Sequence, residues 1–266
     1  MDDVIDFGGQ GRTILLLHGL MGRATTWWPL TRWLTRYGRV VAMDARSHGR
    51  SRHRGSTWRT PDFVADAAEV LSHYGPGVVI GHSMGGLHGL GVAATHPSLV
   101  HGLVVEDMAV DLRGRTVDAW RGLFDAWPVP FRSLAHLHEF FGPVVGPYFA
   151  ECVEERADGY HLLSEVDDLF AIAAEWGREE YWSWVDAVRC PMLVVEAEHT
   201  AMPPGQQAEI ARRAGGVHLL VEGAGHLVHA SAPDLFRGAV EAFLSGQEVD
   251  LPGGGVQDGD SRHAGA

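Results

Sequence analysis

The chain of 266 residues is long enough for one sizeable core and short for two large domains, so we expect one domain with an insertion. Its 34 acidic and 21 basic residues give a formal net charge of -13, which argues against a nucleic-acid partner. All 21 basic residues are arginines, and the lack of lysine excludes Walker A loops, pyridoxal-phosphate Schiff bases and lysine-based aldolases.

The two cysteines, Cys152 and Cys190, lie far apart and outside any CxxC pattern, so the sequence supports neither a disulfide framework nor a cysteine zinc site. The chain opens with acidic residues, and no apolar run reaches the ~20 residues that a membrane-spanning helix needs. We therefore expect a cytoplasmic protein with no membrane span, and monomer and homodimer both stay open.

Short apolar runs alternate with longer helical patterns, which predicts parallel strands joined by crossover helices. The expected strands are residues 13–17, 40–43, 78–80, 103–105, 192–195 and 218–221. The expected helices are residues 26–37, 61–74, 83–95, 206–214 and 233–244. The strands lack the polar alternation of a half-exposed sheet, so we expect helices on both faces. The predicted fold class is α/β, with a mostly parallel, doubly wound sheet.

The alternation stops between residues 111 and 186, where 14 of the 24 phenylalanines, tyrosines and tryptophans gather. We interpret residues 111–186 as a helical cap inserted before the last two strands, with residues 1–110 and 187–245 forming the core. Most of the aromatic side chains are expected to fill the cap's own core, and a few to face a ligand. Residues 246–266 are rich in glycine and polar residues, which predicts a disordered tail.

The strongest chemical signal is the segment at residues 81–86, which reads GHSMGG between an expected strand and an expected helix. A sharp strand-to-helix turn flanked by small residues can present a nucleophilic serine at the carboxyl edge of a sheet. Ser83 is therefore the candidate nucleophile, and the amide of Met84 is a candidate donor to an oxyanion. A serine that merely caps a helix is the alternative interpretation.

A second glycine-rich turn follows the first expected strand at residues 18–22, which read HGLMG. The amide of Leu20 is expected to complete an oxyanion hole with the amide of Met84, because backbone N–H groups fixed in a dry site suit that task. His18 is expected to hold this turn by hydrogen bonds. The side chains or backbone expected to contact the substrate are those of His18, Gly19, Met21, His82 and Trp182.

A serine hydroxyl is a weak nucleophile and needs an imidazole within hydrogen-bond distance. Among 16 histidines, His226 is the preferred base because it ends a glycine-rich turn, residues 223–226, between the last expected strand and the final helix. His229, three residues later, is the alternative and is expected to pack or to cap.

Three residues compete as the acid that orients the imidazole. The place where an aspartate is expected, shortly after the fifth strand, holds Thr200, which cannot be an anion. Asp107 follows the expected strand at residues 103–105, which comes after the helix that begins at Ser83. It is therefore expected at the same carboxyl edge of the sheet as the nucleophile and is the preferred acid. Glu198 and Glu106 remain alternatives, and a loop or capping role is the other interpretation of Asp107.

In chain order these pieces resemble the α/β-hydrolase family from about residue 14 to residue 244. More narrowly, residues 44–51, which read DARSHGRS, are similar to the DxRxHGxS signature of a group of small bacterial esterases and their mitochondrial relatives. The segments at residues 18–22, 81–86 and 103–107 also match that group.

The resemblance implies that Asp107 serves as the triad acid and that a small hydroxyl residue, here Thr200, replaces the usual later acid. It also implies an aromatic-lined helical cap over an acyl pocket. The chain departs from this group at Val110, where relatives often carry a proline after the acid.

The sequence thus predicts a serine hydrolase that cleaves carboxylic esters of small to medium apolar acyl groups through an acyl-enzyme, with no cofactor or metal. Acyl transfer, thioester hydrolysis and carbon–carbon bond cleavage can use the same three residues and stay open. A hydrolase-fold module that binds a ligand without turnover is the alternative outside enzymes. Epoxide hydrolases and dehalogenases are disfavoured because they need an aspartate nucleophile where Ser83 stands.

Overall fold

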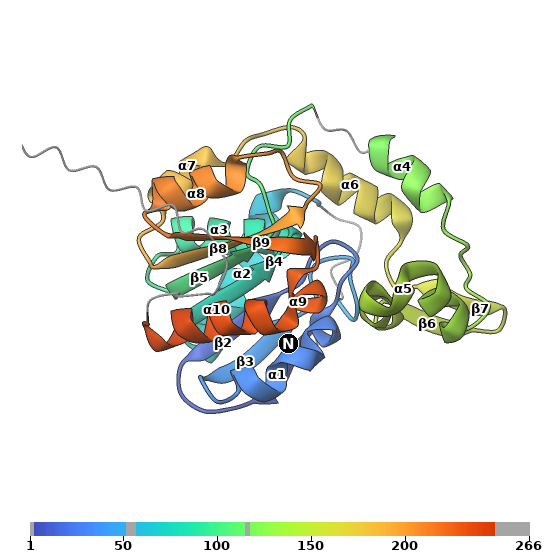
Figure 1. The fold of residues 1–266 in the computed structure, drawn as a ribbon, viewed down its shortest axis with the longest axis horizontal. Coiled ribbons are helices and arrows are strands. Elements are labelled where there is room, and N and C mark those ends of the chain that lie inside the picture. The colour runs from blue at the N-terminus through green and yellow to red at the C-terminus, as the bar shows by residue number, and fades with distance from the viewer. Residues whose placement is uncertain (1–2, 52–56, 115–117, 248–266) are drawn as a thin grey trace, which may run out of the picture.

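A computed structural model describes residues 3–51, 57–114 and 118–247. Its main sheet has seven strands in the order β1-β3-β2-β4-β5-β8-β9, and every neighbouring pair is parallel except β1 with β3 (Figure 1). The prediction of a mostly parallel α/β sheet is therefore confirmed.

Six of the seven strands contain the apolar runs expected from the sequence, because continuous valine, leucine and isoleucine suit strands that are covered on both faces. The strands are β1 (Val4–Gly8), β2 (Thr13–Leu17), β3 (Arg39–Met43), β4 (Gly77–His82), β5 (Val100–Glu106), β8 (Met192–His199) and β9 (Val217–Gly225). The sequence does not predict β1, which lies at the sheet edge, is only half-buried and carries an aspartate in its middle.

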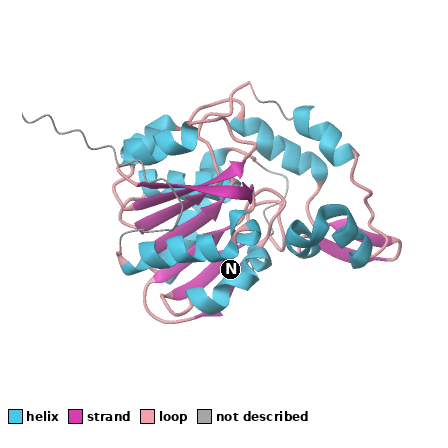
Figure 2. Ribbon diagram, in the orientation of Figure 1, coloured by secondary structure: helices cyan, strands magenta, loops and turns pink. Residues whose placement is uncertain are grey.

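Helices cover both faces of the sheet, which produces the three layers seen in Figure 2. One face carries α2 (Thr60–Tyr74), α3 (Met84–Thr95) and α8 (Gln206–Ala214), and the other carries α1 (Trp28–Leu34) and α10 (Pro233–Ser245). Successive strand side chains point to opposite faces, so Leu15 and Leu17 join the first buried cluster while Ile14 and Leu16 join the second. Because helices cover both faces, the ends of the strands form the accessible edge of the sheet.

Three expected helices begin elsewhere than predicted, one of them, α2, by a single residue, at Thr60. The segment expected as one helix at residues 26–37 is a 3-10 turn, η1 (Ala24–Trp27), followed by the shorter α1, whose first turn contains a proline. The helix expected from residue 83 begins at Met84, because Ser83 has a positive φ that a right-handed helix does not allow.

The segment between β5 and β8 is not wholly helical, as the sequence had suggested. Besides helices it contains a two-stranded hairpin, β6 (Val153–Arg156) and β7 (Gly159–Leu162). The sequence does not reveal this hairpin because β6, which reads VEER, is mostly exposed and lacks apolar alternation. The helices are α4 (Asp118–Asp125), α5 (Leu134–Ala150), α6 (Val166–Trp176) and α7 (Trp182–Ala187). In Figure 1, α4, α5 and the hairpin form a lobe beside the sheet.

The lobe and the neighbouring α6 are hydrogen-bonded to the loops that follow β2 and β3, respectively. Thr25 Oγ1 donates to the Glu151 carboxylate at 2.6 Å, and Ser47 Oγ donates to Asp168 of α6 at 2.8 Å. The lobe therefore lies at the carboxyl edge of the sheet. Side chains from the end of α6 and from α7 pack into the same buried cluster as side chains of α2 and α3. The border between cap and core predicted at residue 186 therefore lies within this cluster, and the division into cap and core stays a prediction.

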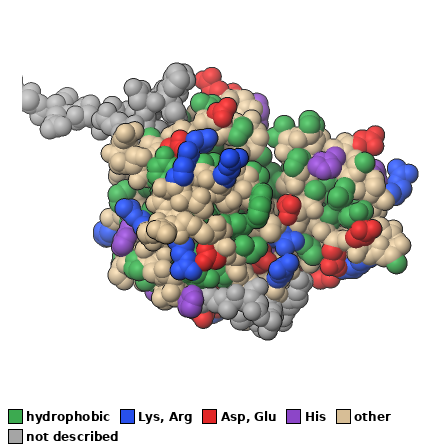
Figure 3. Space-filling model, turned by 90° about the horizontal axis from the view of Figure 1, so that it is seen from below, with side chains coloured by type: hydrophobic (Ala, Val, Ile, Leu, Met, Phe, Trp, Pro, Cys, Tyr) green, Lys and Arg blue, Asp and Glu red, His purple; other side chains and the backbone are tan. Residues whose placement is uncertain are grey.

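The lobe keeps apolar surface in contact with water. Val129, Leu134, Phe140 and Val144 are among the exposed large hydrophobic side chains, and Figure 3 shows hydrophobic side chains spread over its visible face. None of the helices in the described ranges is long and apolar enough to cross a membrane. The predicted disordered tail falls almost entirely on residues 248–266, which lie outside the described residues.

Candidate active site

Ser83 lies on a strained turn between β4 and α3. Its φ of 51° and ψ of −121° are costly for a residue with a side chain, by about 1–3 kcal/mol. The turn is held because the Ser83 amide donates to the Glu106 carbonyl at 2.7 Å and because a glycine, Gly85, stands two residues later. A Cβ on Gly85 would lie 2.1 Å from the carbonyl oxygen of Leu17. The sequence around Ser83 therefore folds into the geometry of a nucleophile elbow.

His226 follows β9 directly, because residues 223–225, which the sequence predicts as a turn, are the last residues of that strand. His226 there meets Asp107, which follows β5. His226 Nδ1 donates to Asp107 Oδ2 at 2.6 Å, and the imidazole is partly exposed while the carboxylate is fully buried. Asp107 itself has a positive φ of 48°, and its amide donates to the Val195 carbonyl at 2.8 Å. Three strand ends thus bring the candidate nucleophile, base and acid to one edge of the sheet. No hydrogen bond joins Ser83 Oγ to His226 among the described residues, and such contacts often form only with substrate.

The Asp107 carboxylate accepts four hydrogen bonds, two on each oxygen. Oδ1 accepts from the Ala197 amide at 3.0 Å and from Gln207 Nε2 at 2.8 Å, and Oδ2 accepts from Thr200 Oγ1 at 2.8 Å besides His226. Burial raises the pKa of Asp107, but its hydrogen bonds and the charge of His226 outweigh burial and hold that pKa below its usual value. The carboxylate is therefore ionised beside the imidazole at neutral pH.

The two competing acids have other partners. Glu198 accepts from the amide of Gly223 at 2.7 Å and so holds the last part of β9. Glu106 is fully buried and accepts from the amide and from Nδ1 of His229 at 2.8–2.9 Å. Burial raises the pKa of Glu106, and the neighbouring His229 and His82 lower it to a net value below the usual one.

The turn at residues 18–22 lies directly beside Ser83. A Cβ on Gly19 would be 3.2 Å from Ser83 Cβ, and the turn is closed by a hydrogen bond of 2.9 Å from the Gly22 amide to the Gly19 carbonyl. In the described part of the chain, the amides of Leu20 and Met84 donate to no other residue. Two backbone donors therefore remain available next to the serine.

The side chains expected to contact substrate lie in different surroundings. His18 and His82 are buried: His18 bonds to two backbone groups, and His82 Nε2 donates to the His226 carbonyl at 3.0 Å. Met21 packs in an apolar cluster with cap residues Leu162 and Leu169. Trp182 lies instead against α8, where the Arg213 guanidinium is 4.9 Å from its ring centroid, so the structure does not bring it to Ser83.

Sequence reasoning missed Gln207 and His48. Gln207 is fully buried in the first turn of α8, and its only sequence signal is its place shortly after Thr200. His48 accepts a hydrogen bond from the Met21 amide at 3.1 Å, and its signal is the DARSHGRS segment, which the sequence marks as a family feature without a role. Within the described ranges, no group of three or more histidine, cysteine, aspartate or glutamate side chains could hold a metal ion.

The fold is that of a known family. The model for the alpha/beta hydrolase family matches residues 14–239, which is most of the chain. The chain belongs to the alpha/beta hydrolase family.

Individual relatives are distant. The (E)-2-((N-methylformamido)methylene)succinate hydrolase of Acinetobacter baylyi is 25% identical over 244 residues, covering 89% of this chain and 91% of the relative. An sn-1-specific diacylglycerol lipase of Danio rerio is 39% identical over 115 residues, covering 41% of this chain and 36% of the lipase. A crystal structure of E-2-(acetamidomethylene)succinate hydrolase superposes with a TM-score of 0.81 at 22% identity, covering 91% of this chain and 94% of that one, which shows the shared fold.

Proposed function

We propose that the protein is a serine hydrolase that cleaves carboxylic esters of small to medium apolar acyl groups through an acyl-enzyme. The observation that carries this proposal is the meeting of the strained Ser83 turn with the His226–Asp107 hydrogen bond of 2.6 Å at one sheet edge. The resemblance of residues 44–51 to the DxRxHGxS esterases and the partial match to a diacylglycerol lipase support the choice of esters.

In this reaction Ser83 Oγ attacks the acyl carbon while His226 Nε2 removes the hydroxyl proton. His226 then returns the proton to the leaving alcohol, and water attacks the acyl-enzyme with the same imidazole as base. Asp107 stabilises the imidazolium and holds Nδ1 protonated, because a carboxylate only accepts hydrogen bonds. Thr200 donates to Asp107 and, unlike an aspartate at that position, adds no second carboxylate beside it.

We assign to the amides of Leu20 and Met84 the stabilisation of the negative charge that develops on the carbonyl oxygen. Each such donor lowers the barrier by about 3 kcal/mol in related oxyanion holes. The acyl group is assigned to the apolar cluster between core and cap, where Met21 packs with Leu162 and Leu169 and is flanked by Phe124 and Trp127. We assign His18 and His82 to support of the surrounding loops, and we leave Trp182 out of the site.

Steady-state hydrolysis of p-nitrophenyl esters from acetate to decanoate tests this function. The wild type is expected to turn over with a chain-length optimum that measures the acyl pocket, and Ser83→Ala is expected to lose turnover, because the attacking oxygen is gone. No turnover by folded wild type, or activity that survives in Ser83→Ala, would contradict the proposal. Thioesters, diketones and alternative acyl acceptors would then be the substrates to compare.

We propose a cytoplasmic location because both cysteines are free thiols. Cys152 and Cys190 are both free, and burial raises the pKa of the Cys152 thiol. The partner of the site is a small acyl substrate, with the negative net charge arguing against nucleic acid.

A further inference from the structure

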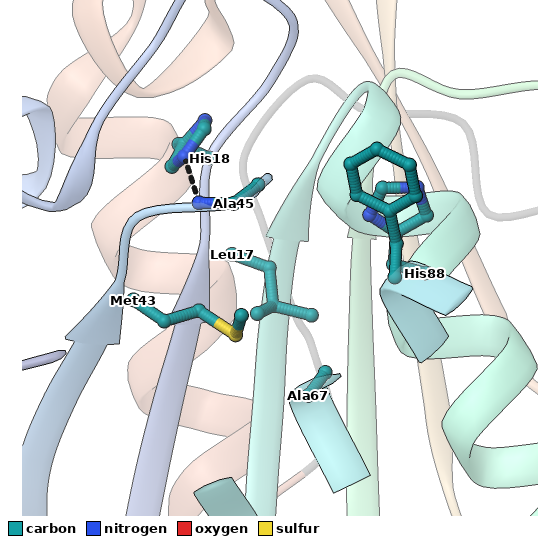
Figure 4. Close-up of a pocket in the computed structure, with 7 residues that line it drawn as sticks. Leu17, His18, Met43, Ala45, Ala67 and His88 are labelled. Carbon is teal, nitrogen blue, oxygen red and sulfur yellow. Dashed lines mark hydrogen bonds between the residues drawn. The ribbon is translucent and has the colours of Figure 1, made fainter. Parts of the chain in front are cut away.

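Two histidines join the loops that follow β2 and β3 by reciprocal hydrogen bonds. His18 of the first loop accepts at Nε2 from the Ala45 amide of the second loop at 3.0 Å, as Figure 4 shows. His48 of the second loop accepts at Nε2 from the Met21 amide of the first loop at 3.1 Å. Their ring centroids lie 5.0 Å apart. We call His18 and His48 together the histidine clasp.

The opposite nitrogen of each ring fixes which tautomer is present. His18 Nδ1 lies 2.7 Å from the Gly19 carbonyl oxygen, and His48 Nδ1 lies 2.8 Å from the Arg46 carbonyl oxygen. A carbonyl oxygen only accepts hydrogen bonds, so Nδ1 carries the proton in both rings and Nε2 keeps its lone pair for an amide. Burial lowers the pKa of His18 to about 4, so this ring is neutral near pH 7.

These contacts hold both peptide units on either side of the Leu20 Cα. The Gly19 carbonyl, which accepts from His18 Nδ1, belongs to the same planar unit as the Leu20 amide. Because C=O and N–H of a trans peptide point in opposite directions, a donor on the Gly19 oxygen fixes the direction of the Leu20 N–H and polarises it. The next unit contains the Met21 amide, which His48 holds. Met21 has a positive φ of 70°, a conformation that needs such support.

The loop that carries His48 is itself rigidly braced. Asp44 accepts from the Ala24 amide and from the Arg50 amide, each at 2.6 Å, which ties the loop at two points. Ser47 Oγ donates to Asp168 at 2.8 Å and ties it to the cap. A rigid loop is what a positioning group requires, because a hydrogen bond from a mobile partner would not fix an amide to within the tolerance of catalysis.

We propose that His18 and His48 are positioning residues for the oxyanion hole, which aim and polarise the Leu20 amide through the histidine clasp. This inference rests on the proposed function, in which that amide stabilises the tetrahedral intermediate. Neither ring touches the reacting atoms, so neither is a catalytic residue. A clasp that only stabilised the fold would change the free energy of unfolding without a selective effect on the chemical step.

Two substitutions of one residue separate these roles. In His48→Gln the amide oxygen can take the place of Nε2 and accept from Met21, whereas His48→Asn can keep the donor to Arg46 but leaves Met21 without its acceptor. We expect His48→Asn to lower kcat on the best p-nitrophenyl ester roughly 10- to 100-fold, less than the loss of a whole oxyanion donor, with little change in KM. His48→Gln is expected to recover most of that loss.

His88→Leu is the matched control. His88 is another buried histidine of the same region, stacked on Phe63 at 4.7 Å and lining, with His18, a cavity of ≈ 10 Å³ (Figure 4). It takes no part in the clasp, so its loss is expected to change stability but to leave kcat within about twofold. Equal losses of kcat in His88→Leu and His48→Asn, at equal thermal midpoints, would overturn the proposal.

Binding of 1-butaneboronic acid reports the oxyanion hole directly, because boron becomes tetrahedral on a serine hydroxyl. Its affinity is expected to fall in His48→Asn by the same factor as kcat/KM. An unchanged boronate affinity, or a loss confined to KM, would overturn the inference.

Hydrogen exchange of the Met21 amide, followed by NMR, tests whether His48 holds this amide and needs no activity measurement. Exchange is expected to be slow in the wild type and in His48→Gln and faster in His48→Asn. Equal exchange in all three would show that the clasp does not hold this amide. Absence of ester turnover by the wild type would instead contradict the proposed function, so the two failures are distinguishable.

Discussion

Replacing Asp107 by asparagine is expected to lower kcat by about 10⁴-fold, the scale of loss when a triad acid is neutralised. Asp107 Oδ2 accepts from His226 Nδ1 at 2.6 Å and from Thr200 Oγ1 at 2.8 Å. An asparagine amide loses the negative charge that stabilises the imidazolium. If its NH₂ group turns to His226, it also favours the tautomer with Nε2 protonated, which cannot take the serine proton. The measurement is kcat on the best p-nitrophenyl ester near pH 8.

Glu198→Gln is the matched control, since it makes the same chemical change in the competing acid. The Glu198 carboxylate accepts from the Gly223 amide, a bond that the glutamine oxygen can replace, so kcat is expected to stay within about threefold of the wild type. Small and equal effects of Asp107→Asn and Glu198→Gln would remove Asp107 from the triad. A larger effect of Glu198→Gln would move the acid to β8.

Acidification from about pH 7 to about pH 5 is expected to lower the free energy of unfolding by roughly 5 kcal/mol, a large part of the usual total. His18, His82 and His88 are fully enclosed, and burial lowers the pKa of His18 to about 4 and those of His82 and His88 to about 3. In the unfolded chain each has a pKa near 6.5. Between these values the unfolded state binds more protons, so stability falls with falling pH.

The pH window separates the histidines from the buried acids. Asp107 and Glu106 have pKa values below their usual 3.8 and 4.5, so they also destabilise the folded state in acid, but only below about pH 4.5. Each histidine contributes about 2 kcal/mol over the range above that pH. The measurement is the urea midpoint at about pH 7, 6 and 5 at constant ionic strength, with stability extrapolated to water.

His88→Leu is expected to reduce the slope of stability against pH by about one third, because unfolding then takes up about two protons instead of three near pH 5. The same slope in the variant would mean that His88 is protonated in the folded protein. A flat profile in the wild type would contradict the assignment of all three histidines as buried neutral rings.

The sequence predicts best where one physical cause dominates. β2 was expected at residues 13–17 and spans Thr13–Leu17, because a strand covered on both faces must be apolar throughout. The turn around Ser83 is also visible in the sequence, because no side chain fits at its flanking glycines. A Cβ on Gly81 would lie 2.3 Å from the Gly85 carbonyl oxygen, and a Cβ on Gly85 would lie 2.1 Å from that of Leu17.

What the sequence leaves hidden depends on contacts between distant segments. Gln207 meets Asp107 across 100 residues, and His48 meets Met21 across 27, so no spacing rule announces either pair. β1 and the β6–β7 hairpin are half-exposed, so they lack the apolar run that marks the buried strands. Thr200 lies between these two cases. The sequence shows that an acid is missing at this position, and only the structure shows that Thr200 donates a hydrogen bond to Asp107.

Formation of an acyl-enzyme on Ser83 is the central claim, and intact-protein mass spectrometry after rapid acid quenching tests it most directly. During turnover of a p-nitrophenyl ester the wild type is predicted to gain the mass of one acyl group, which peptide mapping places on Ser83, and Ser83→Ala is predicted to gain none. An acyl group on any other residue, or p-nitrophenol release by the wild type with no adduct at any quench time while Ser83→Ala releases it equally fast, would contradict the account.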